Sequence, residues 1–538
     1  MDGTMMDFPL TLTPMLERAG KLFGDVEIVT RLPDKSLHRH TFAEFHQRTR
    51  RLAAALEGAG LKRGERVATI MWNGYAHLEA YFAVPCSGGV LHTLNFRLHE
   101  NDIAFIANHA EDRFLIVDDV LLPIFERIKD KVKFERVFVV PLSGAPIPEG
   151  LENYEDFLAT GRADYAFPEL KENEASGMCY TSGTTGRPKG VAYSHRAMVL
   201  HTFCVGLADT VGLTQRDVLM PVVPMFHANA WGLAHAAMMM GSKLAFPGPH
   251  MDAENILGLC ESEQVTLAAG VPTIWIGILQ ALEADSGRWK LHPDLRSVVG
   301  GSALPEGMIR GFDRHGITTI HAWGMTEMTP IGTISRLKRG MEALSEDERY
   351  QARAKQGLAV PFVEMRVIND EGEAPWDGES MGELQVRGPW IASSYYNSEE
   401  GSDKWSADGW FGTGDVVTID KEGYVKITDR TKDLIKSGGE WISSVDLENA
   451  LMGHAGVREA AVIAVPHEKW TERPLAVVVA AEGAAPSAAE LKEYLSQSFA
   501  KWWLPDNYEF VDEIPRTSTG KFLKTALREK FATRDWGA

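Results

Sequence analysis

Short apolar stretches alternate with amphipathic segments along the first 360 residues, and this alternation constrains the fold more than any other feature. Arg66–Met71, Phe114–Val117 and Val137–Val140 have the length and composition of buried strands. Segments such as Phe42–Leu56 repeat apolar residues at helical spacing. Strands that alternate with helices predict an α/β fold, in which helices cover mostly parallel sheets.

The sequence pattern changes at about residue 361. From there, turn signals separate short predicted strands such as Met365–Ile368, Glu383–Val386 and Gly423–Ile427. This pattern indicates a β-rich subdomain at about 361–429. Since 538 residues exceed what one core usually organises, we expect at least two domains.

The last hundred residues predict a small α+β domain. A helix is expected at Ser444–Met452, strands at Ala460–Val465 and Leu475–Ala481, and another helix from Ala488. The charged segment Asp429–Asp433 precedes them. The predicted organisation is therefore a large domain at 1–429, a hinge at 430–433 and a small domain at 434–538.

The formal charge is −19, and the four cysteines include no C-x-x-C pair. A chain this acidic repels nucleic acid, so phosphate must be bound locally. Residues 228–246 are the longest weakly polar run, but His235, Gly241 and Lys243 interrupt it, so no transmembrane segment is expected. Scattered cysteines and the absence of a secretory-type start predict a cytoplasmic location.

The most informative motif is Tyr180–Gly190, which reads YTSGTTGRPKG. Its glycines and small hydroxyl residues can wrap N–H and O–H donors around phosphate oxygens. It is not a Walker-type loop, because Arg187 follows Gly186 where that motif has Lys and Ser/Thr. Taken alone, the segment is equally compatible with a flexible surface loop.

Five further segments follow in order: Gly300–Pro305, His321–Glu327, Gly409–Asp415, Asp429–Ser443 and Pro515–Lys521. Together with the glycine-rich motif they resemble the acyl-adenylate-forming superfamily, and the resemblance covers nearly the whole chain. It implies that a carboxylic acid is activated with ATP and Mg²⁺ and is then transferred to coenzyme A. It also implies that the small domain rotates between the two steps.

The resemblance implies a role for each matching residue. Thr326 contacts the α-phosphate, Asp415 and Arg430 the ribose, Lys432 is the pivot, and Gly438 and Gly439 lie along pantetheine. It assigns nucleotide- or coenzyme-binding roles to Thr181, Ser182, Gly183, Thr184, Thr185, Gly186, Lys189, Gly301, Ser302, Ala303, His321, Ala322, Trp323, Gly324, Met325, Thr326, Asp415, Arg430, Lys432, Gly438, Gly439, Glu440 and Trp441. It assigns the metal to Thr181 and Glu327, catalysis to Lys521, Glu327 and His227, and the acyl site to His227, Trp231, Val271, Gly301, Trp323 and Gly324.

The acid is less constrained than the chemistry. Amino-acid-activating relatives place an aspartate after the position of Phe226, whereas this chain has His227. Trp231 resembles the residue that gates an acyl tunnel. The residues expected to line it are Met225, Ala236, Met238, Met239, Met240, Val271, Pro272, Met325 and Met328. These features favour a CoA ligase for medium- or long-chain fatty acids. Methylmercaptopropionate and aromatic acids stay open, and a homodimer is implied by the relatives.

Two other classes can be weighed against this interpretation. Gly378–Gly382 matches the G-x-S-x-G motif of serine hydrolases, with Ser380 as the nucleophile. That motif needs a strand before the serine and a helix after it, whereas a turn precedes Ser380 and a strand-like run follows. A protein that only binds nucleotide is disfavoured, since Glu327, Asp415 and Lys521 are all present.

Overall fold

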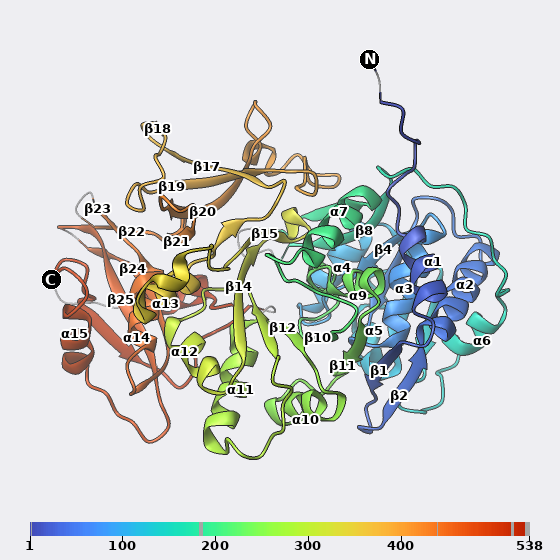
Figure 1. Ribbon diagram of the computed structural model, residues 1–538, viewed down its shortest axis with the longest axis horizontal. Helices are drawn as coiled ribbons and strands as arrows, with labels where there is room; N and C mark the ends of the chain where they lie inside the picture. The colour runs from blue at the N-terminus through green and yellow to red at the C-terminus, as the bar shows by residue number, and fades with distance from the viewer. Residues whose placement is uncertain (2, 182–186, 438–439, 468, 518–520, 533–538) are drawn as a thin grey trace.

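Two large, mostly parallel sheets form the N-terminal part of the computed structural model, which describes residues 1–532 except 2, 182–186, 438–439, 468 and 518–520 (Figure 1). The first has nine strands in the order β16-β15-β14-β13-β12-β10-β11-β1-β2, parallel from β14 to β1. Its strands are β1 Glu27–Arg31, β2 Leu37–Thr41, β10 Val218–Pro221, β11 Lys243–Phe246, β12 Leu267–Gly270, β13 Arg296–Val299, β14 Thr318–Gly324, β15 Ile331–Ile334 and β16 Leu358–Ala359.

The second sheet has seven strands in the order β7-β6-β5-β3-β4-β8-β9, and only β9 runs antiparallel to its neighbour. Its strands are β3 Arg66–Ile70, β4 Val90–Thr93, β5 Asp112–Asp118, β6 Arg136–Val140, β7 Glu152–Asn153, β8 Ala175–Tyr180 and β9 Gly190–Ser194. The three strands expected near residues 66, 114 and 137 are thus confirmed as β3, β5 and β6. Consecutive parallel strands require crossover helices, as the sequence predicted.

Helices cover both sheets and fill the space between them. They are α1 Thr13–Leu22, α2 Phe42–Gly58, α3 Tyr75–Cys86, α4 Glu100–His109, α5 Leu122–Ile128, α6 Tyr154–Ala159, α7 His195–Gly206, α8 Ala228–Trp231, α9 Leu233–Met240, α10 Ala253–Glu263, α11 Pro272–Ala284, α12 Glu306–Arg314 and α13 Glu346–Ala354. The start of α2 shows how the sequence sets an end: the Thr41 side chain accepts from the Glu44 N–H, and Glu44 accepts from the Thr41 N–H. No helix among the described residues is long and apolar enough to cross a membrane.

A five-stranded antiparallel sheet in the order β18-β17-β19-β20-β21 occupies residues 364–430. Its strands are β17 Glu364–Asn369, β18 Gly372–Glu373, β19 Gly382–Arg387, β20 Phe411–Ile419 and β21 Val425–Arg430. This sheet is the β-rich region that the turn signals indicated. The short helix η2, Thr326–Met328, follows β14. It lies against the segment between β19 and β20, where the Ala392 N–H donates to the Glu327 carbonyl.

The C-terminal domain is a separate α+β unit, drawn in orange to red at the left of Figure 1. It contains β22 Ile435–Ser437, β23 Glu440–Ile442, α14 Ser444–Met452, β24 Val457–His467, β25 Thr471–Ala480, α15 Ala488–Ser496, β26 Asn507–Phe510 and α16 Lys524–Phe531. Alternate residues of β24 face two separate apolar clusters: Ala460 and Val462 face one, Ala461 and Ile463 the other. The α/β fold with a large first part and a small last domain is confirmed, whereas the exact domain boundaries stay a prediction.

Candidate active site

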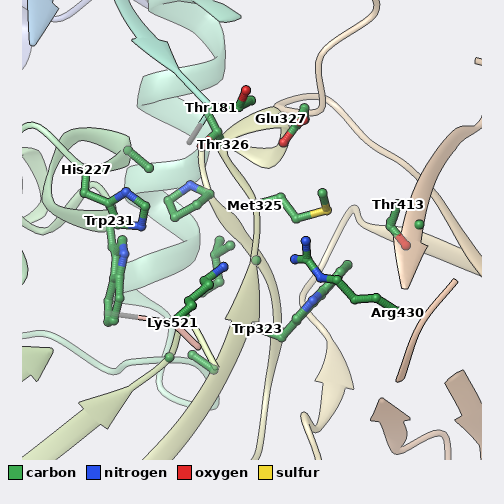
Figure 2. A pocket seen from close by; sticks show the side chains of 18 of the residues that line it. Thr181, His227, Trp231, Trp323, Met325, Thr326, Glu327, Thr413, Arg430 and Lys521 are labelled. Carbon is green, nitrogen blue, oxygen red and sulfur yellow. The ribbon is translucent and has the colours of Figure 1, made fainter. Parts of the chain in front are cut away.

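A cavity of about 420 Å³ lies where the large part, the β-rich sheet and the C-terminal domain meet (Figure 2). Thr181 follows β8, Glu327 lies in η2, Arg430 ends β21, and Lys521 comes from the C-terminal domain. A second cavity of about 200 Å³ adjoins it and shares Trp323, Arg430 and Lys521 with the first. Segments far apart in the sequence therefore converge on one continuous site.

The base of the glycine-rich motif is closed by backbone contacts. The Thr181 N–H donates to the Lys189 carbonyl at 2.9 Å, and the Lys189 N–H donates to the Thr181 hydroxyl at 3.1 Å. The Lys189 ammonium pairs with Glu400 at 3.2 Å. Ser182, Gly183, Thr184, Thr185 and Gly186 lie outside the described residues. Both ends of the motif nevertheless line the cavity, where a phosphate ligand was expected.

Glu327 is the only carboxylate among the described residues that line the first cavity. Tyr395 donates its hydroxyl to Glu327 Oε1 at 2.7 Å, and both residues are buried. Oxygen donors such as this carboxylate and the nearby Thr181 hydroxyl suit Mg²⁺, which is commonly held by one or two carboxylates together with substrate phosphates. No group of three or more His, Cys, Asp or Glu side chains that could hold a metal ion occurs among the described residues. The residues present therefore fit a magnesium ion that enters with a nucleotide.

Asp415 is fixed by two neighbours. It pairs with Arg430 across β20 and β21, so their side chains meet, with Arg430 Nε 3.2 Å from Asp415 Oδ1. The Trp323 indole N–H donates to Asp415 Oδ2 at 3.0 Å. Because a carboxylate oxygen accepts more than one hydrogen bond, the oriented Asp415 can still receive two neighbouring hydroxyl groups.

Lys521 reaches into the cavity between the His227–Trp231 side and the Trp323–Arg430 side (Figure 2). Burial, and then the charge of Arg430, lowers the pKa of Lys521 to about 8. Burial, and then the charge of Lys521, lowers the pKa of His227 to about 4, so this imidazole is neutral at pH 7. Lys521 is thus the cation that the C-terminal domain contributes to the site, and His227 is an uncharged hydrogen-bonding group beside it.

The second cavity holds the remaining predicted nucleotide residues: Gly301, Ser302, Ala303, His321, Ala322 and Gly324. Burial lowers the pKa of His321 to about 4, and its Nδ1 lies 3.0 Å from the Ala354 carbonyl oxygen. Because that oxygen only accepts, Nδ1 carries the proton of the neutral ring. The lining of this cavity has four acidic side chains (Asp415, Asp429, Asp433 and Glu448) and four basic ones (Arg430, Lys432, Lys521 and Lys524), so it lacks the positive excess of the first cavity and offers a place for an uncharged base.

Trp231 enters the cavity from an unusual backbone segment. Residues 228–231 all have positive φ, between 42° and 57°, and Gly232 continues the left-handed turn at 72°. The buried Asn229 side chain anchors this turn, accepting from the Cys179 thiol at 3.2 Å. Left-handed backbone is unfavourable for residues with a Cβ, so the surrounding contacts must hold the turn.

Beside Trp231 the cavity is lined by aliphatic side chains, which we call the acyl wall: Val205, Val211, Leu233, Val298, Ile331 and Ile334. The expectation of a methionine lining is wrong for most of its members, because Met225, Met238, Met239 and Met328 are buried in the core; Met325 does line the cavity. Val271 is not among the lining residues: it packs behind Gly301, where an added Cβ would lie 3.3 Å from it.

The coenzyme loop is only partly described. Gly438 and Gly439 lie outside the described residues, and Glu440 begins β23. Trp441 is 38% exposed, with the Lys436 ammonium 4.4 Å from its ring centroid. Lys432 lines both cavities, next to Arg430.

Besides the aliphatic residues, five polar residues that line the first cavity were not predicted as site residues: Arg187, Tyr395, Lys404, Thr413 and Thr431. Arg187 and Thr413 lie within recognised motifs, so the motifs could have indicated them. Tyr395 and Lys404 lie in the segment between β19 and β20, which carries no motif that we recognised. Their place in the site depends on how that segment folds back onto η2.

The serine-hydrolase alternative is excluded by geometry. Ser380 lies in a turn directly before β19, and its hydroxyl donates to Asp377 at 2.8 Å. A strand, not a helix, follows it, and its hydroxyl donates a hydrogen bond to Asp377 rather than to a histidine. No histidine among the described residues is hydrogen-bonded to Ser380 as an activating base.

Comparison with known proteins agrees with this site. Residues 16–396 match the model for AMP-binding enzymes, and residues 446–521 match the AMP-binding enzyme C-terminal domain. The chain is 51% identical to a long-chain-fatty-acid–CoA ligase of Thermus thermophilus, over 100% of this chain and 98% of the other, and 45% identical to a 3-methylmercaptopropionyl-CoA ligase of Ruegeria pomeroyi, over 99% of each. The solved structure of the anthranilate CoA ligase AuaEII with anthranoyl-AMP superposes with a TM-score of 0.87 at 26% identity, covering 97% of this chain and 98% of the other. ATP, coenzyme A and Mg²⁺ are the substrates and cofactor typical of such enzymes. The chain belongs to the AMP-binding enzyme family, within its acyl-CoA ligase branch.

Proposed function

We propose that this acyl-CoA ligase acts on an apolar monocarboxylic acid of medium or long chain length. The acyl wall carries the proposal, because six aliphatic side chains adjoin the cationic part of the cavity. Each methylene that such a wall removes from water contributes about 0.8 kcal/mol, which is roughly a four-fold gain in kcat/KM per carbon until the space is filled. The Thermus relative, a long-chain-fatty-acid–CoA ligase, supports this substrate class.

In the first step a carboxylate oxygen attacks the α-phosphorus of ATP, and pyrophosphate leaves as the bond to the β-phosphate breaks. Two anions must approach each other, so positive charge at the reacting atoms lowers the barrier. Lys521 supplies that charge, and the neutral His227 hydrogen-bonds the acid. A Mg²⁺ ion held by Glu327 and Thr181 would add positive charge beside the phosphates when it is bound.

The nucleotide is then held by the remaining polar residues. Asp415 accepts the ribose hydroxyls while Trp323 and Arg430 keep its carboxylate in place. Ser302, Ala303 and His321 surround the base in the second cavity. These assignments place the α-phosphate near Thr326 and Lys521, where the two cavities join.

In the second step the thiol of coenzyme A attacks the acyl carbon, and AMP leaves. We infer that the C-terminal domain, residues 434–538, rotates about the hinge 430–433, with Lys432 as the pivot. That motion withdraws Lys521 and makes room for pantetheine beside Gly438 and Gly439. A cytoplasmic homodimer is part of the same proposal.

A coupled assay for pyrophosphate and thioester tests this function. Butanoate, octanoate, dodecanoate, hexadecanoate, methylmercaptopropionate and benzoate are compared with and without coenzyme A. We expect kcat/KM to rise with chain length from butanoate to at least octanoate, with thioester formed only when coenzyme A is present. A preference for methylmercaptopropionate or benzoate over octanoate would replace the fatty acid by one of the two alternatives.

A further inference from the structure

The carboxylate of Glu327 is held by the side chain of Tyr395, which takes no part in the two reaction steps. The Tyr395 hydroxyl donates to Oε1 at 2.7 Å, and each residue is only 6% exposed. No hydrogen bond from a described residue to Oε2 is observed. One carboxylate oxygen is therefore committed to the protein, and the other remains to bind a metal.

The segment that carries Tyr395 also holds the backbone of η2. The Ala392 N–H donates to the Glu327 carbonyl at 2.7 Å, and the Trp405 indole N–H donates to the Ala392 carbonyl at 2.7 Å. The Thr329 hydroxyl donates to the Trp390 carbonyl at 2.7 Å. Glu327 is thus fixed at its main chain and at its side chain by one segment, residues 390–405.

The same segment contacts the base of the glycine-rich motif. The Tyr396 N–H donates to the Gly190 carbonyl at 2.8 Å, and the Lys189 ammonium lies 5.8 Å from the Tyr395 ring centroid. Gly401 closes the other side of the ring: its φ is +84°, and an added Cβ would lie 3.0 Å from Tyr395 Cε2. The ring is therefore confined between the phosphate motif and a glycine that leaves it just enough room.

We propose that Tyr395 is a positioning residue that fixes the orientation of the Glu327 carboxylate, so that the affinity of the site for nucleotide-bound Mg²⁺ depends on the Tyr395 hydroxyl. A free glutamate side chain loses much conformational entropy when it binds an ion. Tyr395 removes that cost in advance by holding one rotamer. Partners of metal ligands typically change metal affinity 10- to 100-fold when they are removed. This inference rests on the proposed metal role of Glu327.

The test uses the full-length protein and a non-hydrolysable ATP analogue, α,β-methylene-ATP, so that neither the acid nor coenzyme A is needed. Calorimetry measures binding of the analogue over a series of Mg²⁺ concentrations. For Tyr395→Phe we expect the Mg²⁺ concentration at half-saturation to rise about 10-fold. At saturating Mg²⁺ the dissociation constant of the analogue should stay within about two-fold of the wild-type value, because the phosphate contacts remain. Mn²⁺ in place of Mg²⁺, followed by electron paramagnetic resonance, gives a second readout of the same site.

Tyr396→Phe is the matched control, because it removes a phenol hydroxyl one residue away and should leave the Mg²⁺ dependence unchanged. A wild-type Mg²⁺ dependence in Tyr395→Phe, with a weakened one in Glu327→Gln, would overturn the role of Tyr395 and leave the metal site intact. Wild-type behaviour in both variants would overturn the metal assignment as well. If Tyr395→Phe does not fold, Gly401→Ala crowds the ring from the other side, and it should shift the Mg²⁺ dependence in the same direction.

Discussion

The cationic half and the acyl half of one cavity are built in opposite ways. In the cationic half, Arg187, Lys189, Lys404, Arg430, Lys432 and Lys521 face a single carboxylate, Glu327, among the described lining residues. There the contacts are directional hydrogen bonds and ion pairs at 2.7–3.2 Å. In the acyl half, six aliphatic side chains define a shape and offer no directional contact. A chain with a formal net charge of −19 thus gathers six cationic side chains around one cavity.

Because the two halves are built differently, the cationic half should control the rate of the reaction and the acyl half the choice of acid. Charges that face the reacting phosphorus act mainly in the transition state, so their removal lowers kcat. Aliphatic contacts bind the ground state and the transition state equally, so they set which acid is used. Substitutions in the two halves should therefore be distinguishable by kinetics alone.

The largest expected effect follows from removing the cation of the C-terminal domain. Lys521→Ala should lower the rate of acyl-adenylate formation by about 10²–10³-fold, because a preorganised charge at the transition state is lost. Thioester formation from preformed acyl-AMP should stay within about three-fold, since the proposed domain rotation withdraws Lys521 in that step. Acid-dependent pyrophosphate release and single-turnover thioester formation measure the two steps. Lys530→Ala in α16, which removes an exposed lysine of the same domain, is the control; an equal loss in both steps would contradict the assignment.

A smaller effect is expected from narrowing the acyl half. Val211 is buried, and its carbonyl accepts from Arg296 at 3.1 Å and from Arg336 at 3.3 Å, so the loop cannot easily move away from a larger side chain. Val211→Phe should therefore exclude two or three methylenes and lower kcat/KM for dodecanoate about 10- to 50-fold. Butanoate should change less than two-fold. Leu207→Phe, at an exposed position of the same loop, is the control; a parallel loss for both acids would show that Val211 serves only the fold.

The two halves also differ in how far they could be predicted. Apart from Lys404 and Tyr395, the cationic half consists of motifs in which neighbouring residues act together, so Thr181 and Glu327, and Asp415 beside them, were indicated by short segments. The acyl wall draws one residue each from α7, α9, β13 and the loop after α7, and two from β15, and no local pattern marks them. The methionines were expected there on flexibility alone, but packing buried most of them in the core. Tyr395 was missed because its contact with Glu327 depends on how a loop folds back, which periodicity does not specify.

The fold itself was easier to anticipate, since strands such as β3 and β6 are continuous apolar runs and α2 has a capping box at its start. The order of the strands within each sheet could not be anticipated from the sequence. β3 lies between β5 and β4, and β12 lies between β10 and β13. Such neighbours are decided by crossover connections and by the burial of both faces of the sheet. No single segment carries that information.

The smallest expected effect distinguishes the halves by pH. His201 lies against the acyl half: the Ile331 N–H donates to its Nε2 at 3.3 Å, and burial lowers the pKa of His201 to about 3. The unfolded chain, with an ordinary histidine pKa of about 6.5, binds the proton first, so stability falls as the pH drops below 6.5. Between pH 7 and pH 5.5 this one residue should lower the free energy of unfolding by about 1 kcal/mol.

The variant His201→Gln keeps an acceptor for the Ile331 N–H but does not titrate. Its free energy of unfolding should therefore fall by about 1 kcal/mol less than that of the wild type over the same pH interval. Urea unfolding followed by tryptophan fluorescence measures this difference. His315→Gln, at a partly exposed histidine, should lose as much as the wild type; equal acid sensitivity in all three proteins would show that His201 does not contribute to it.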